Sequence, residues 1–198
     1  MKLVLGIELF FIMIACSGCG ILYGYKNIKA FDESTYEKFI SNVNDTAITI
    51  KSLISDYSKF EKYRTNFKDS LWRNSYSGQP VQILYFLNDS LVSYHINCMA
   101  PGLFSKINWN ALGRFDCFPP LSAVSLCNVD ININDILDLY QISNNNNCVV
   151  FIFWTTMFKK ISKSAIETVK LNFHQYGEDY NGMIYLINTD NYYIEKCN

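Results

Sequence analysis

Residues 148–154 form an uninterrupted run of apolar side chains, and this run restricts the possible folds of the chain more than any other segment. A short apolar run rich in β-branched and aromatic residues is typical of a strand that is covered on both faces. Apolar positions then recur at helical spacing from Ile161 to Phe173, and a second strand-like run follows at residues 183–189. This order predicts a βαβ unit with parallel strands and a right-handed crossover, preceded by a short helix over residues 130–142.

Two further β-rich runs lie within residues 81–98, on either side of turn-forming residues at 88–90. They predict a β-hairpin, because Asn, Asp and Ser side chains can hold the bend through local hydrogen bonds. Residues 99–128 follow without a lasting period and predict a long ordered loop. Two interpretations of this loop remain open: a functional loop, or an arm that covers a hydrophobic sheet face with Trp109 and Phe118.

Apolar residues between Tyr36 and Tyr57 are spaced alternately by three and four positions, which is the period of an amphipathic helix. Ser34 with Glu37 three residues later matches a capping box and marks the start of this helix. The pattern predicts a long helix within residues 31–72. Its apolar stripe would pack against the rest of the domain or, as the alternative, form a coiled-coil seam between two copies.

The composition fits one folded domain after a short leader. A chain of 198 residues with 49% hydrophobic and 16% aromatic residues has enough apolar surface for one core. The 17 Lys and Arg residues nearly balance the 18 Asp and Glu residues without a basic block, which argues against nucleic-acid binding. We therefore predict an α+β domain over residues 31–198, in which a long N-terminal helix, a β-hairpin and the βαβ unit form a mixed sheet.

The amino terminus carries the pattern of a signal peptide over residues 1–19: Lys2, an apolar run, and small residues before Cys19. A small residue pair directly before Cys resembles the lipobox of bacterial lipoproteins, in which signal peptidase cuts and the Cys becomes the acylated first residue. This resemblance implies lipidation at Cys19, or at Cys16 as the alternative, and a tether over residues 20–30. An uncleaved anchor helix and an ordinary buried segment are the other two interpretations.

Residues 153–154 end the first strand of the βαβ unit with Phe-Trp, a helix follows, and residues 187–190 close the second strand. On these features, residues 130–198 resemble the first half of a thioredoxin-type domain of membrane-anchored thiol oxidoreductases. The resemblance implies two redox cysteines at the start of the helix, but Phe158 and Ile161 occupy those places and cannot exchange a disulfide. The predicted hairpin would complete the sheet.

The whole chain, with its lipobox, long helix, thioredoxin-like end and many Asn, Tyr, Ile and Lys residues, is similar to uncharacterised lipoproteins of Bacteroidetes bacteria. This resemblance implies O-glycosylation where Asp is followed by Ser or Thr and an apolar residue, at Thr46, Ser70 and Ser90. It also implies a periplasm-facing anchor, because residues 20–30 lack the acidic residues that mark surface-exposed lipoproteins.

No metal or cofactor site is predicted, because His95 and His174 have no other ligand residue nearby at metal-binding spacing. Besides an acylated Cys19, the mature chain would keep an odd number of cysteines, so at least one thiol would stay unpaired. The remaining cysteines are Cys98, Cys117, Cys127, Cys148 and Cys197.

Thr155, Thr156 and the amides at the start of the helix after Trp154 are predicted to lie at the carboxyl end of a parallel strand. Open α/β sheets usually bind ligands at this edge, and a helix start favours anions. With the positive charge of Lys159, these residues form a candidate site for an anion or a partner carboxylate. The alternative is a solvated helix start.

The sequence thus predicts an exported, lipid-anchored, periplasm-facing protein of the cell envelope with a non-enzymatic binding or structural role. Its predicted partners are the membrane, through the anchor, and another envelope protein, with no nucleic acid and no cofactor. The alternative is a thiol-dependent thioredoxin-like oxidoreductase that uses noncanonical cysteines such as Cys98 and Cys148. A truncated, decayed gene product is a third interpretation.

Overall fold

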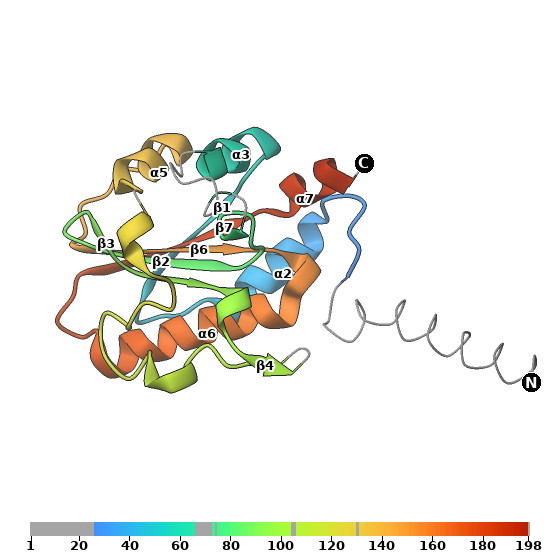
Figure 1. The fold of residues 1–198 in the computed structure, drawn as a ribbon. Coiled ribbons are helices and arrows are strands. Elements are labelled where there is room, and N and C mark those ends of the chain that lie inside the picture. Colours follow the sequence, from blue (N-terminus) through green and yellow to red (C-terminus); the bar gives the residue numbers. More distant parts are fainter. Residues whose placement is uncertain (1–25, 66–72, 74, 104–105, 130, 198) are drawn as a thin grey trace, which may run out of the picture.

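A five-stranded mixed sheet with helices on both faces forms the body of the protein (Figure 1). The computed structural model describes residues 26–65, 73, 75–103, 106–129 and 131–197. In chain order its main elements are α2 (Glu33–Val43), β1 (Thr49–Ile54), α3 (Tyr57–Thr65), β2 (Gln82–Leu87), β3 (Ser90–Ile96), β4 (Gly102–Leu103), β5 (Lys106–Ile107), α5 (Ile133–Tyr140), β6 (Cys148–Trp154), α6 (Lys159–Tyr176), β7 (Gly182–Asn188) and α7 (Asp190–Cys197).

The strand order in the sheet is β1-β7-β6-β2-β3. β1, β7 and β6 run parallel, whereas β2 lies antiparallel to both β6 and β3. The α+β class, the mixed sheet, the βαβ unit and the hairpin predicted from the sequence are therefore confirmed. The hairpin also completes the sheet as expected, because β2 pairs with β6 along its whole length.

The hairpin between β2 and β3 turns through Asn88 and Asp89. Both residues have positive φ, 45° and 66°, and the last strand pair on either side is Leu87 with Ser90. Two-residue hairpin turns with positive φ at both central positions match the twist of the strands, and Asn and Asp tolerate that conformation better than other non-glycine residues. The local sequence thus determines this turn.

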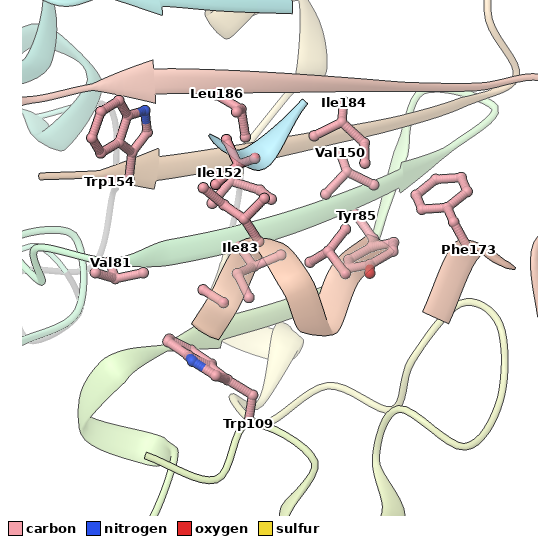
Figure 2. Packing of buried hydrophobic residues seen from close by; sticks show 14 of the residues in the cluster. Val81, Ile83, Tyr85, Trp109, Val150, Ile152, Trp154, Phe173, Ile184 and Leu186 are labelled. Atoms are coloured by element: carbon pink, nitrogen blue, oxygen red, sulfur yellow. The ribbon is translucent and has the colours of Figure 1, made fainter. Parts of the chain in front are cut away.

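β6 is buried along its whole length because its two faces contribute to two separate cores. Its odd-numbered side chains face α3, α5 and α7, and its even-numbered side chains face α2 and α6. Figure 2 shows the second core, where Val150, Ile152 and Trp154 lie against side chains of β2, β7 and α6. This two-sided burial explains why the run at 148–154 has no polar residue.

The long helix predicted over residues 31–72 is wrong. The structure replaces it with α2, the edge strand β1 and α3. Lys170 and the side chain of Asp45 fix the turn after α2: Lys170 Nζ donates to the carbonyl of Val43 at 3.2 Å, and Asp45 accepts from the Ala47 amide at 2.9 Å. The spacing was ambiguous because residues four apart, such as Ile50 and Ile54, share a face in both a helix and a strand.

The predicted capping box is also wrong. Asp32 is the N-cap of α2, and its carboxylate accepts from the amide of Thr35 at 3.1 Å and from its hydroxyl at 2.7 Å. The apolar side of α2 packs on its own domain, as the sequence favoured, since Phe39 and Val43 are buried and Phe39 stacks on Trp154 at 4.1 Å between ring centroids.

The segment between β3 and α5 covers one face of the sheet, as in the second of the two interpretations of residues 99–128. Trp109 is 2% exposed in the second core, and Phe118 packs against the same core. Further along, Ser122 and Ala123 cover the outer edge of β3: the Ser122 hydroxyl accepts from the Tyr94 amide at 3.0 Å, and the Ala123 amide donates to the Tyr94 carbonyl at 3.1 Å.

Within the part of the chain that the structure describes, no helix is long and apolar enough to cross a membrane. The predicted signal peptide at 1–19, with Cys16 and Cys19, and the tether residues 20–25 lie outside the described residues.

Ile152→Ala tests the two-sided burial of β6. Removing this fully buried side chain leaves a cavity in the centre of the sheet, so we expect the free energy of unfolding to fall by about 2–5 kcal/mol. Leu171→Ala is the matched control, since this α6 residue is 57% exposed and should change the stability by less than about 0.5 kcal/mol. Urea unfolding followed by circular dichroism measures both, and equal effects would contradict the assignment.

Candidate functional site at the carboxyl edge of the parallel strands

Buried polar side chains gather where β1, β6 and β7 end. Because these strands are parallel, their carboxyl ends meet at one edge of the sheet, which is the usual ligand-binding edge of open α/β sheets. Each of the polar residues at this edge is at most 7% exposed. They are Ser55, Thr155, Thr156, Ser162, Asn188, Thr189 and Asp190.

The Asp190 carboxylate lies at the centre of this cluster. One of its oxygens accepts from the Thr155 hydroxyl at 2.6 Å and from the Thr156 amide at 2.8 Å. The other oxygen accepts from the Thr156 hydroxyl at 2.7 Å. We call these three residues the Asp190 latch. Three donors compensate the cost of burying a carboxylate that is 2% exposed.

The latch is held by the strand ends themselves. Both the amide and the hydroxyl of Thr189 donate to the Trp154 carbonyl, at 2.9 and 3.1 Å, so the ends of β6 and β7 are joined directly beside it. The Asp190 amide donates to the Asn188 side chain at 3.0 Å. The Thr155 hydroxyl also accepts from the Met157 amide at 3.1 Å. Thr155 is thereby the N-cap of the short 3-10 helix before α6.

The predicted anion site thus holds a carboxylate of the chain itself. The structure brings Thr155 and Thr156 together, and both donate to Asp190; Lys159 is exposed at the first position of α6. Asp190 was missed as a site residue, although its position just after a predicted parallel strand was a usable signal, because the carboxyl ends of both strands must meet.

Two buried donors at this edge have no hydrogen-bond partner within the described residues: the indole nitrogen of Trp154 and the amide nitrogen of Asn188. The two residues are register partners on β6 and β7, and so lie side by side. Tyr36 and Phe39 of α2 stack on the Trp154 ring. An acceptor reaching this position would therefore find two donors already in place.

Cys98 and Cys148, the cysteines of the oxidoreductase alternative, lie too far apart to form a disulfide with each other. Cys148 lies opposite Leu87 at the turn end of the sheet, whereas Cys98 follows the far end of β3. The six residues of β2 separate the two ends by roughly 20 Å at about 3.3 Å per residue, beyond the reach of a disulfide. Burial raises the pKa of Cys98 and raises that of Cys148 to about 12, which disfavours both thiolates.

Of the other cysteines, Cys127 is exposed and Cys117 is half-buried, and both are free thiols. The side chain of Cys197 lies outside the described part of the molecule.

His95 is buried beside Ser93 on β3. The Ser93 hydroxyl and the Nε2 atom of His95 are 2.9 Å apart, and the imidazole packs on Phe115 at 4.6 Å between ring centroids. Burial, with a smaller effect of the nearby Arg114 charge, lowers the pKa of His95 to about 3. The imidazole is therefore neutral at physiological pH and has a structural role in the core.

His174 is 42% exposed on α6 and lies 3.1 Å from the Asp45 carboxylate. The Ala47 amide and then the His174 side chain lower the pKa of Asp45 to about 2. Over the stretches that the structure describes, no group of three His, Cys, Asp or Glu residues is placed to hold a metal ion.

The three predicted glycosylation residues have different positions. Thr46 is exposed in the turn between α2 and β1, rather than inside a helix. Ser90 is exposed at the start of β3. Ser70 lies outside the described residues.

Neither a scan against protein-family models nor searches of curated proteins and solved structures found a match to the chain. The fold and the Asp190 latch together define an α+β protein with a mixed five-stranded sheet in which the chain's own carboxylate accepts from the donors that follow β6, at the usual ligand edge.

Asp190→Asn tests the latch. The amide retains the shape but presents NH₂ to donors, so we expect the free energy of unfolding to fall by about 2 kcal/mol or more. Thr156→Val removes one partner, and the double variant should lose less than the sum of the two single variants, because both act on one network. The control is Asp138→Asn at an exposed position of α5. Denaturant unfolding measures all four, and strict additivity would contradict the latch.

His95 predicts a pH dependence of stability. As the pH falls through about 6.5, the unfolded chain binds a proton at this histidine while the folded protein does not, so folding becomes less favourable. Between pH 6.5 and pH 5 the loss should be about 2 kcal/mol. His95→Gln should remove this slope, and His174→Gln should retain it. Asp45 contributes only below about pH 4, outside this window.

Proposed function

We propose that this protein is an exported, lipid-anchored protein of the cell envelope with a non-catalytic binding or structural role. The observation that carries the non-catalytic part is the chemistry after β6. Phe158 and Ile161 stand where a thioredoxin-like enzyme would have its thiols, and the hydroxyls of Thr155 and Thr156 are bonded to Asp190. This position therefore has no nucleophile that could exchange a disulfide.

The lipid anchor is supported by the small residues before Cys19 and by where the domain begins. The Lys26 amide already donates to the Met157 carbonyl at 2.9 Å, so the chain is attached to the end of the sheet within a few residues of Cys19. The link from Cys19 to Lys26 spans at most about 25 Å. A lipid on Cys19 would keep the carboxyl edge of the parallel strands close to the bilayer.

The sequence resemblances supply the finer parts of the proposal. A periplasm-facing anchor, a thioredoxin-like ancestry of the βαβ unit and a second envelope protein as partner all belong to it. Exposure of Thr46 and Ser90 is compatible with O-glycosylation, because a modifying enzyme must reach the hydroxyl. Thiol-dependent oxidoreduction has less support, since Cys98 and Cys148 lie at opposite ends of the sheet and burial raises both pKa values.

The test is the intact mass of the protein extracted from its native membrane, combined with thiol labelling before and after unfolding. We expect an acylated product that begins at Cys19 and is lost in Cys19→Ala but retained in Cys16→Ala. In the folded protein, Cys148 should be alkylated only after unfolding, because it is buried and its pKa is about 12.

An unprocessed product that begins at Met1 would contradict the lipid anchor. A single cysteine that is alkylated rapidly at pH 6, and whose replacement abolishes a thiol-dependent activity, would favour the oxidoreductase instead.

A further inference from the structure

A solvent-open cleft of about 370 Å³ lies at the opposite end of the sheet from the Asp190 latch. It is formed by the amino ends of β1 and β7 and by the last turn of α6 with the loop that follows it. Its volume is within the roughly 300–1,000 Å³ that small-molecule sites occupy. At the edge that α/β sheets usually use, Asp190 already accepts from the donors that follow β6. The cleft is a separate candidate for binding a small molecule.

Two packed aromatic rings, Phe173 and Tyr180, line the cleft and form its aromatic wall. Phe173 of α6 lines the cleft and packs closely on β7. A Cβ added at Gly182 of β7 would lie only 2.3 Å from the Phe173 ring, so this position needs a glycine. Tyr180 lines the wall, and its ring packs on Phe118 at 4.7 Å between centroids. The Tyr180 amide closes the loop by donating to the Gly177 carbonyl at 3.1 Å. The aromatic wall is therefore preorganised.

Polar side chains surround this aromatic wall. Thr49, Glu178 and Asn181 line the cleft, are exposed, and form no side-chain hydrogen bond within the described chain. His174 lines it too, and its ring is oriented by the Asp45 carboxylate at 3.1 Å. The hydroxyl, the amide and the imidazole can each donate and accept, whereas Glu178 only accepts.

The charges around the cleft select among ligand classes. Glu178 is the carboxylate that lines the cleft, and an anion bound there would be repelled by it. Asp45 adds little to this repulsion, because its charge is paired with Lys170 at 3.6 Å and with His174 at 3.1 Å. An amine would use only acceptors and leave the donors of Thr49 and Asn181 without a partner. A neutral ligand with several hydroxyl groups would use both, because each hydroxyl donates one hydrogen bond and accepts others.

We propose that this cleft binds a neutral polyhydroxylated ligand, a monosaccharide or a sugar unit of a larger glycan. The apolar face of the sugar ring packs on Tyr180, and its hydroxyls bond to Thr49, His174, Glu178 and Asn181. This inference rests on the binding role in the proposed function and names its ligand class, but it does not depend on the lipid anchor.

The experiment is a calorimetric titration of the purified full chain, in a detergent without a sugar headgroup, with glucose, galactose and N-acetylglucosamine. Inorganic phosphate and putrescine serve as the anionic and cationic probes. Asn181→Ala, Glu178→Gln and Tyr180→Ala should each weaken sugar binding tenfold or more. The matched controls, Glu195→Gln and Tyr176→Ala, change exposed residues outside the cleft and should bind as the original protein does.

The melting temperature of every variant separates loss of binding from loss of folding, and two exposed cleft positions, Glu178 and Asn181, keep the test valid if Tyr180→Ala unfolds. The proposal is overturned if no sugar of the panel binds at tens of millimolar, if the cleft variants bind it unchanged, or if phosphate or putrescine binds instead. The mass measurement tests the anchor separately, so either proposal can fail alone.

Discussion

The burial of β6 on both faces, between β7 and β2, is the constraint on which the rest of the structure depends. A strand without a polar face must be covered twice, so α3, α5 and α7 pack on one side and α2 and α6 on the other. The arm with Trp109 extends the second cover over the hairpin strands. The helices, the hairpin and the arm thus all help to exclude water from the central strand.

The same central pair of strands creates the Asp190 latch. The crossover through α6 brings Asp190 to the amide and hydroxyls that follow β6, although 34 positions separate it from Thr156. A carboxylate there satisfies donors that an external anion would otherwise meet, and joins the ends of β6 and β7. The two ends of the sheet therefore differ: one carries the buried Asp190 latch, and the other carries the open cleft.

Local pattern was sufficient for elements whose burial or backbone conformation follows a regular pattern along the chain. The run at 148–154, the amphipathic α6 and the turn at Asn88 and Asp89 follow from burial and backbone preference alone. The stretch from 31 to 72 was misread because an edge strand with intermediate burial has no clear period of two, and Ile50 and Ile54 fit a helical stripe as well. Pairing with β7 makes it a strand, and that partner lies more than 120 positions away.

The sequence by itself determined the α+β class, the βαβ unit and the hairpin, because hydrophobic period and turn chemistry are local properties. Only the tertiary structure decided that β1 is a strand, that Thr155 and Thr156 bind Asp190 instead of an external anion, and that Cys98 and Cys148 lie apart. Each of these depends on which distant segments become neighbours. Which segments become neighbours depends on the packing of the whole sheet, because many distant segments together bury the two faces of β6.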